Sequence, residues 1–189
     1  MQVLKSEIRQ AILSSARDEF YKNGYTQTSM RTIASNVGIT VGNIYRYFVS
    51  KEELFNVILE PVIKAIIEVA HVDEQLNIIK IDTKEEAKLI VDSILSMIKN
   101  FTKELFILVF NSEGSLYQFM KDDLIKIVEV KLMRIFNQTE NSYFVKIIST
   151  SFVQALFVIF KDHVDDYDQI AELITELLIF YFRDFNSRV

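Results

Sequence analysis

Apolar residues recur every three or four positions along most of the chain, the spacing that places them on one face of an α-helix. The pattern predicts a first helix from about Ser6 to Asn23, and Gly24 follows where a helix commonly ends. The residues expected on its inward face are Ile8, Ala11, Ile12, Ala16 and Phe20.

Two short helices come next, joined by a tight turn. Thr28 and Ser29 are N-cap candidates for the first of them, and Gly38 is expected to end it. Thr40 can cap the second, which is expected from about Val41 to Phe48. Two short helices with a glycine turn between them are typical of the helix-turn-helix motif.

Two capping boxes predict where longer helices begin. Ser50 and Glu53 can exchange hydrogen bonds at the start of a fourth helix, and Thr83 and Glu86 can do the same for the next one. Pro61 interrupts the fourth helix, which either kinks there or ends. Further helices are expected near residues 84–99, 102–112, 117–137, 141–162 and 167–186.

The chain is therefore expected to be all-α and to have two parts. A three-helix head is expected over residues 1–50, with the helix-turn-helix at about 29–48, and a helical body over residues 51–189. One Pro and 4 Gly in 189 residues agree with this, because both residue types weaken helix interiors. No linker rich in Pro or Ser is present, so the helix from residue 51 is expected to join the parts rigidly.

Composition restricts the class of protein. With 50% hydrophobic residues the chain is in the globular range, and the lack of Cys excludes disulfides and thiolate metal sites. The longest uncharged apolar stretch, residues 147–160, is shorter than the ~20 residues of a membrane-spanning helix. The N-terminus lacks the apolar core of a signal peptide. We expect a soluble, cytoplasmic protein.

Charge is unevenly distributed along the chain. Residues 1–51 carry seven basic and three acidic side chains, a net charge of +4, whereas the remainder carries 14 basic and 23 acidic ones, a net charge of −9. A basic head on an acidic body suits a protein that contacts phosphates at one end only, and chance variation is the alternative.

The third helix carries the most distinctive chemistry. Tyr45, Arg46 and Tyr47 are consecutive, so they spread around the helix and cannot all face the core. Ile44 and Phe48 are four residues apart and can anchor the inward face. Tyrosine hydroxyls and arginine are donors suited to phosphate oxygens and base edges.

Residues on either side of this run add to the picture. Gly42 and Asn43 lie near the start of the helix, where a glycine lets the backbone approach a partner closely. Lys51 lies in the first turn of the fourth helix, where the helix dipole disfavours a cation unless a phosphate binds there. The alternative is a solvated lysine offset by Glu52 and Glu53.

From Ile8 to Leu59 the sequence resembles the TetR family of bacterial regulators. The matching residues keep a fixed spacing over about 50 positions and are Ala16, Phe20, Gly24-Tyr25, Thr28-Ser29, Ile33-Ala34, Val37-Gly38-Ile39, Gly42, Tyr45, Tyr47-Phe48, Lys51-Glu52 and Leu54. The remainder matches only in size and helical content.

This resemblance implies that the third helix enters the major groove of double-stranded DNA. The residues at positions that usually hold phosphates are Thr28, Tyr45, Tyr47 and Lys51. Those at positions that usually approach bases or nearby backbone are Val41, Gly42, Asn43 and Arg46, with Arg31 as a further contact. It also makes residues 51–189 the expected ligand-binding and dimerisation domain.

The last two helices are expected to form a homodimer. The run from Tyr143 to Phe160 is apolar nearly all round, so it must be covered on several sides, and TetR relatives cover such helices with a second subunit. Burial within one subunit is the alternative. The expected interface residues are Phe157, Phe160, Ile174, Leu177, Leu178 and Tyr181.

Aromatic residues between Phe101 and Phe160 suggest a pocket for a small-molecule effector, and plain core packing is the alternative. The expected lining residues are Phe101, Phe106, Phe110, Tyr117, Phe119, Phe144 and Phe152. Such a pocket would suit a hydrophobic or flat ligand.

The leading hypothesis is a transcriptional repressor that a ligand releases from a palindromic operator, although activation or corepression would use the same parts. A small helical enzyme or carrier is the rival, but the sequence holds no catalytic motif. A membrane-surface protein is disfavoured by the acidic body. His71 and His163 lie far apart, and the acids near His163 lack calcium-loop spacing, so neither metal nor cofactor is expected.

Overall fold

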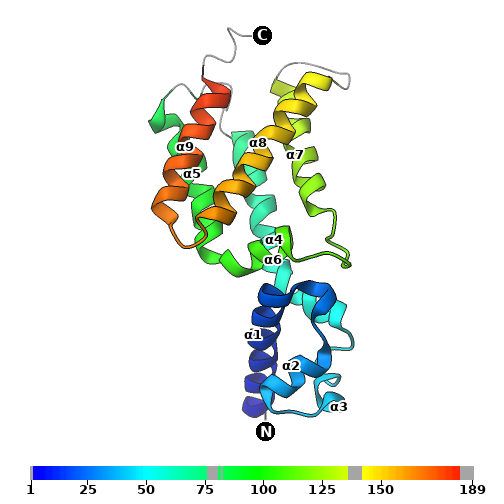
Figure 1. Ribbon diagram of the computed structural model, residues 1–189. Coiled ribbons are helices and arrows are strands. Elements are labelled where there is room, and N and C mark those ends of the chain that lie inside the picture. The colour runs from blue at the N-terminus through cyan, green and yellow to red at the C-terminus, as the bar shows by residue number, and fades with distance from the viewer. Residues whose placement is uncertain (1, 76–80, 82, 136–141, 184–189) are drawn as a thin grey trace. The chain divides into compact units, whose positions relative to one another are not determined.

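A computed structural model describes residues 2–75, 81, 83–135 and 142–183 of the chain (Figure 1). These residues form helices and turns and include no strand, which confirms the all-α prediction. In chain order the helices are α1 (Gln2–Gln27), α2 (Met30–Val37), α3 (Val41–Ile44), α4 (Lys51–Gln75), α5 (Lys84–Asn100), α6 (Thr102–Phe110), α7 (Met120–Ile135), α8 (Tyr143–Asp162) and α9 (Tyr167–Phe182).

The chain divides into two compact units. The head unit consists of the residues up to Lys64 together with Lys103–Phe119, and the body unit consists of Ala65–Thr102 and the chain from Met120 onward. The head unit is thus larger than the expected head of residues 1–50, because it also includes the first half of α4 and nearly all of α6.

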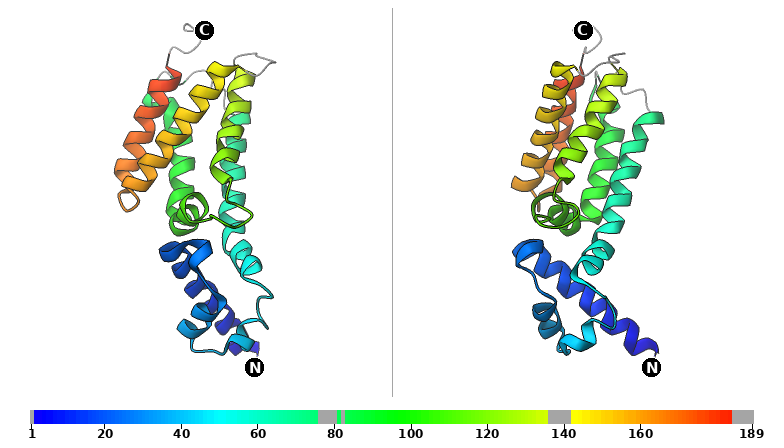
Figure 2. Two further views of the ribbon diagram at one scale, coloured as in Figure 1. Left: turned by 45° about the vertical axis from the view of Figure 1, so that its right-hand side comes forward. Right: turned by 90° about the vertical axis from the view of Figure 1, so that its right-hand side faces the viewer.

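The head unit has a small apolar core between α1, α2, α3 and the start of α4 (Figure 2). Its fully buried side chains are Ile12, Ala16, Phe20, Ile33, Ala34, Ile44, Phe48, Leu54 and Phe55. Ala11, expected on the inward face of α1, is exposed instead. Its position is about 100° around the helix from Ile12, at the edge of the apolar stripe.

Local sequence signals set the ends of the short helices. Ser29 caps α2 by accepting a hydrogen bond from the Thr32 amide, and Gly38 ends it with φ of 74° in the left-handed region. Thr40 caps α3, which ends at Ile44 rather than at the predicted Phe48. The next residues form a tighter turn in which the amides of residues 46 and 47 bond three residues back.

Helix α4 runs through Pro61 without ending, so the break considered from the sequence does not occur. Its predicted capping box is only half formed. Ser50 accepts from the Glu53 amide at 3.0 Å, but the Glu53 carboxylate accepts from the Val49 amide rather than from that of Ser50. The second predicted box, between Thr83 and Glu86 at the start of α5, is complete.

In the body unit α8 lies between α7 and α9, and α5 packs against α9 (Figure 2). Helix α7 begins at Met120, not at 117, because hydrogen bonds of Ser112 and Ser115 with the Tyr117 backbone hold the preceding residues in a turn. The predicted helix ends at 136–137, 141 and 184–186 lie outside the described residues. The main buried apolar side chains are Val91, Ile98, Val145, Phe152, Phe160, Ile174, Leu178 and Phe182.

Candidate nucleic-acid interface

Helix α3 and the turn after it have one buried face and one open face. Ile44 and Phe48 are 0% and 1% exposed, which confirms their predicted role as inward anchors. On the other side Val41 and Tyr45 are 40% and 47% exposed. Arg46 is exposed next to them, so the open face combines apolar, aromatic and cationic groups.

The remaining predicted contacts of this region are also accessible. Gly42 is exposed, and Asn43 and Tyr47 are partly exposed. Arg31 is exposed on α2, which packs against α3. A Cβ atom added at Gly42 would meet nothing within 4 Å, so the backbone at this point faces open space. The structure thus presents seven of the nine predicted DNA-binding residues on the surface of the helix-turn-helix: Arg31, Val41, Gly42, Asn43, Tyr45, Arg46 and Tyr47.

Thr28, predicted to hold a phosphate, is directed into the head unit. It is 3% exposed, and its hydroxyl donates to the Gly24 carbonyl at 2.8 Å. Its amide also bonds to the Gly24 carbonyl, at 3.3 Å. Both donors of Thr28 are therefore used in closing the end of α1, and neither is available to a phosphate oxygen in this conformation.

Lys51 is also directed inward. Its ammonium group donates to the carbonyls of Tyr25 at 2.7 Å and Thr28 at 3.0 Å, and it lies 4.2 Å from the centre of the Tyr25 ring. Burial lowers the pKa of Lys51, and burial followed by the Glu52 carboxylate raises the pKa of Tyr25. Lys51 therefore connects the start of α4 to the end of α1, a role that neither sequence interpretation included.

Other contacts that fix the helix-turn-helix were not found from the sequence. The Glu19 carboxylate accepts from the side-chain amides of Asn23 and Asn36, each at 2.9 Å, and so joins α1 to α2. The guanidinium of Arg9 lies 5.1 Å from the centre of the Phe48 ring, at the end of the turn that follows α3. No local pattern marks the Asn36 and Arg9 contacts, because each involves a partner from another helix or turn, whereas Asn23 and Glu19 are four residues apart within α1.

Helix α6 is bound to α1 within the head unit. The Asn111 side-chain amide donates to the carbonyls of Phe20 and Tyr21, at 3.2 and 2.7 Å, and the Asn111 carbonyl accepts from the Tyr25 amide at 2.9 Å. Two ion pairs, each at 2.7 Å, reinforce the contact and join Arg17 to Glu104 and Asp18 to Lys103. Residues 103–119 thus contact α1, the helix against which α2 of the helix-turn-helix packs.

The aromatic residues predicted to line an effector pocket are divided between the two units of the chain. Phe106 packs on Tyr21 and Phe110, and Tyr117 packs near Phe55, all within the head unit. Phe119 and Phe144 are 62% and 55% exposed. Phe101 ends α5, and Phe152 packs against Tyr181 and Phe182 in the body unit.

The residues predicted at a dimer interface are mostly used inside the body unit. Phe160, Ile174 and Leu178 are 4%, 2% and 3% exposed, and Tyr181 donates to the Ser151 hydroxyl at 2.8 Å. Phe157 and Leu177 are partly exposed. The apolar side chains left open on these two helices are different ones: Tyr143, Phe144, Ile147 and Val158 on α8 and Phe180 on α9.

Comparison with known proteins finds a family match within the head unit. Residues 12–58 match the family model of bacterial regulatory proteins of the tetR family. Over these residues the chain is similar to the tetR family. The regulator UidR of Escherichia coli K12 is 37% identical to it over 59 residues, which are 31% of this chain and 30% of UidR. The match thus spans less than a third of that relative.

Solved structures of transcriptional regulators share the fold over nearly the whole chain. A regulator from Aquifex aeolicus VF5 has a TM-score of 0.65 at 23% identity, covering 93% of this chain and 99% of its own. A TetR-like regulator from Rhodococcus sp. RHA1 has a TM-score of 0.64 at 18% identity, covering 90% and 93%. NalD of Pseudomonas aeruginosa has a TM-score of 0.55 at 20% identity, covering 94% and 96%.

Proposed function

We propose that the chain is a DNA-binding transcriptional regulator that inserts α3 into the major groove of double-stranded DNA. The observation that carries the proposal is the open face of α3, where Val41, Tyr45 and Arg46 are exposed while Ile44 and Phe48 anchor the helix from behind. An α-helix presented in this way fits the width of the major groove.

The exposed residues divide into two groups by chemistry. Arg31, Tyr45 and Tyr47 have donors at their tips and are proposed to contact phosphates. The residues proposed to approach base edges or nearby backbone are Val41, Gly42, Asn43 and Arg46. We assign Thr28 and Lys51 to the frame that holds these residues, since their donors already serve backbone carbonyls.

A homodimer supplies the second head that a palindromic operator needs, with recognition helices about 34–36 Å apart on one face of DNA. Helix α8 is long and apolar enough to cross a membrane on length and composition alone, yet only 28% of it is buried in the described residues. We assign its open apolar side chains Ile147 and Val158 to the contact with a second copy rather than with lipid. The opposite side of α8 is already packed against other helices of the body unit, through Val145, Phe152 and Phe160.

We further propose that the regulator acts in the cytoplasm as a repressor and that a small-molecule effector bound by the body unit releases it from DNA. The chain passes between the two units at residues 64–65, 102–103 and 119–120, and these crossings give an effector routes to influence the head. NalD, which shares the fold, is described as the secondary repressor of a multidrug efflux pump. Corepression and activation remain the alternatives that the DNA experiment separates.

The test is selection of duplexes from a genomic fragment library by the purified chain, followed by binding titrations at several salt concentrations. Binding should weaken steeply as salt rises, because lysine and arginine displace condensed counterions from DNA. Arg46→Ala should weaken binding at least about tenfold. Lys88→Ala removes a lysine from the exposed surface of α5 in the body unit and should leave the affinity unchanged.

Each result has a defined meaning. Selection of a palindromic site by the free protein supports a repressor or activator, and a reporter gene placed behind that site gives the sign of regulation. Selection only in the presence of cell extract supports corepression. If no fragment is enriched in either condition, the proposed DNA-binding function is wrong.

A further inference from the structure

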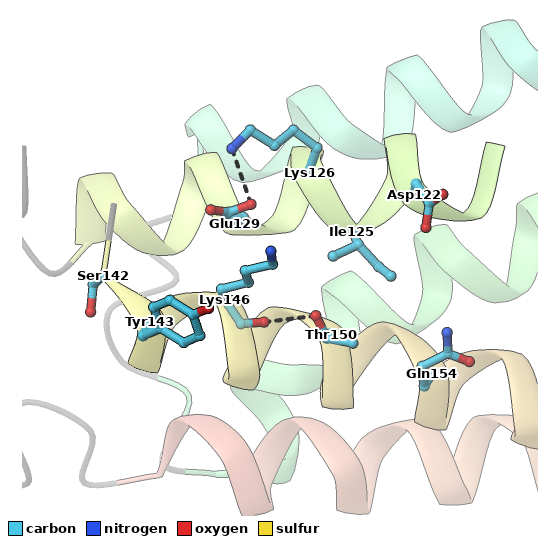
Figure 3. A pocket seen from close by; sticks show the side chains of 9 residues that line it. All are labelled: Asp122, Ile125, Lys126, Glu129, Ser142, Tyr143, Lys146, Thr150 and Gln154. Carbon is cyan, nitrogen blue, oxygen red and sulfur yellow. Dashed lines mark hydrogen bonds and ion pairs between the residues drawn. The ribbon is translucent and has the colours of Figure 1, made fainter. Parts of the chain in front are cut away.

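A cleft with several polar and charged lining residues lies between α7 and α8 in the body unit, and none of the seven aromatic residues named above as the expected pocket lining contributes to it (Figure 3). Its volume is about 620 Å³, within the size range of pockets that bind small metabolites. The side chains that matter for the argument are Lys126 and Glu129 on α7 and Tyr143, Lys146, Thr150 and Gln154 on α8. This lining differs from the aromatic one expected from the sequence.

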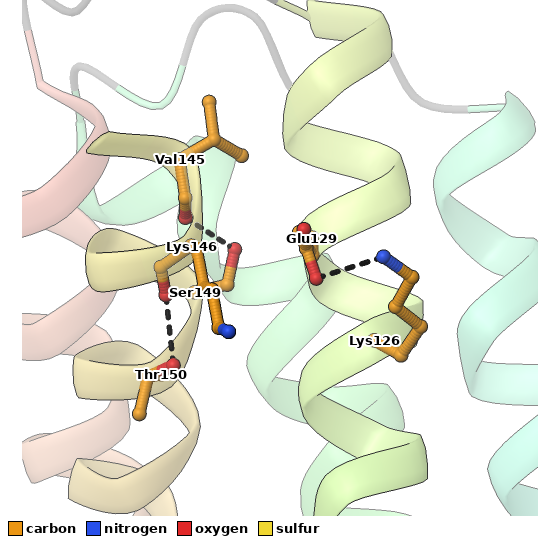
Figure 4. A network of polar contacts seen from close by, with 6 residues as sticks. All are labelled: Lys126, Glu129, Val145, Lys146, Ser149 and Thr150. Atoms are coloured by element: carbon orange, nitrogen blue, oxygen red, sulfur yellow. Dashed lines mark hydrogen bonds and ion pairs between the residues drawn. The ribbon is translucent and has the colours of Figure 1, made fainter. Parts of the chain in front are cut away.

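Two carboxylates line the cleft: Asp122 is exposed to solvent, and Glu129 is already compensated by a cation. Glu129 has a side chain only 9% exposed, and its Oε2 lies 3.1 Å from the ammonium nitrogen of Lys126 (Figure 4). A carboxylate this buried stays charged only when a cation or hydrogen bonds replace its water. The Lys126–Glu129 pair therefore forms a neutral wall of the cleft on α7.

Lys146 is the remaining cation near that wall. Its stem leaves α8 toward the space between the two helices (Figures 3 and 4). Among the described residues no carboxylate lies within 4 Å of its ammonium group, and Glu129 is already held by Lys126. A flexible lysine in a cleft of this kind provides a point charge for an anionic group.

Two further polar side chains follow Lys146 along the same face of α8. Thr150 and Gln154 come four and eight residues later, so the three groups span about 12 Å of helix. The Thr150 hydroxyl donates to the Lys146 carbonyl at 2.8 Å, which leaves its oxygen free to accept a hydrogen bond from a ligand. The Gln154 amide is exposed and can both donate and accept.

We propose that this cleft binds a small, polar organic anion, with the anionic group at Lys146 and its hydroxyl or amide groups against Thr150 and Gln154. The Tyr143 ring, 82% exposed at the same end as Lys146, gives the ligand an apolar surface to lie on. The inference rests on the proposed function in one respect, since it takes this ligand as the effector. Carboxylate and phosphate satisfy Lys146 equally well.

The test uses calorimetric titration of the full-length chain with gluconate and with glycerol 3-phosphate. Sorbitol and glycerol serve as their uncharged counterparts. At least one of the anions should bind saturably, and its counterpart should bind at least about tenfold more weakly. Binding of gluconate alone would identify a carboxylate site, and binding of glycerol 3-phosphate alone a phosphate site.

Variants connect the binding to the cleft. Lys146→Met keeps the length of the side chain and removes the charge, and it should weaken binding of the anion at least about tenfold. Lys146→Arg should restore most of the affinity. Lys88→Met makes the same change on the exposed surface of α5 and should have no effect.

The outcomes separate this inference from the proposed function. Equal binding of the anion by the wild type and Lys146→Met, or saturable binding of neither anion, would overturn the inference, including the case in which a second copy fills the cleft. The same protein is assayed on its selected duplex without any anion. If DNA binding is intact and the anion titration fails, the proposed regulator function stands and only the ligand assignment is wrong.

Discussion

The ammonium group of Lys51 joins two helices of the head unit through a few atoms. It donates to the carbonyls of Tyr25, near the end of α1, and Thr28, just beyond that end. Hydrogen bonds from a charged donor are stronger than neutral ones, and the Tyr25 ring adds a cation–π contact. The residue therefore stabilises the entry to the helix-turn-helix.

We expect Lys51→Met to lower the free energy of unfolding by about 1–2 kcal/mol, because two carbonyls lose a charged donor that is still partly reached by solvent. The salt dependence of DNA binding should stay the same, since no phosphate contact is lost. Urea denaturation and binding at several salt concentrations measure the two quantities.

The control is Lys22→Met, which removes an exposed lysine from α1, the helix that Lys51 contacts, and should leave stability unchanged. A different result would favour the original phosphate prediction for Lys51. In that case stability would stay constant, and the slope of log affinity against log salt would fall by about one.

At the scale of elements, the turn after α2 and helix α3 each contain a glycine, and the backbone requires only one of the two. Gly38 has φ of 74°, where other residues are strained. Gly42 lies inside α3 and has open space around its missing Cβ. One glycine is thus required by the backbone and the other is not.

We expect Gly38→Ala to lower the free energy of unfolding by about 1–2 kcal/mol. Gly42→Ala should keep or raise it, by up to about 1 kcal/mol, because alanine is the better helix former. If the α3 backbone approaches DNA at residue 42, the same change should weaken DNA binding at least about tenfold. Thermal unfolding and DNA titration of both variants check this. Unaltered DNA affinity in Gly42→Ala would place that part of α3 away from the bases.

The contact between α6 and α1 depends strongly on one amide. We expect Asn111→Ala to lower the free energy of unfolding by about 1–2 kcal/mol, because the carbonyls of Phe20 and Tyr21 both lose their side-chain donor. Amide hydrogen exchange in α1 should accelerate as well. Asn100→Ala, at the exposed end of α5, is the matched control. Equal protection of α1 in both variants would show that the Asn111 bonds contribute little.

The elements could be predicted from the sequence where their causes are local. Ser29, Gly38, Thr40 and the box from Thr83 act on backbone within a few residues, so their caps were predictable. The partners of Lys51 and Asn111 lie 23 to 91 residues away, and no periodicity encodes such distances. The aromatic pocket stays a prediction, because aromatic spacing cannot separate a cavity from a packed core.

In the whole molecule, the net positive charge and the exposed apolar side chains of α8 and α9 belong to different parts of the chain. The net positive charge belongs to residues 1–51, which include the helix-turn-helix. The exposed apolar side chains of α8 and α9 belong to the body unit. A protein with one surface for an anionic partner and another for an apolar partner can bind both at once. This is the requirement for a dimer on DNA.

The dimer proposal makes a prediction about mass and DNA affinity together. The wild type should sediment at twice the chain mass of 22.1 kDa, and the double change Ile147→Asp and Val158→Asp should give the monomer, because a carboxylate cannot enter an apolar contact without a partner. The monomer should keep its helical circular dichroism. It should bind a palindromic duplex much more weakly, because a single head binds one half-site without a second, linked head on the other. Leu89→Asp alters an exposed apolar residue of α5, 57% accessible and outside this stripe, and should remain dimeric. If the double variant remains a dimer, the second copy binds elsewhere on the chain and the exposed stripe of α8 has another partner.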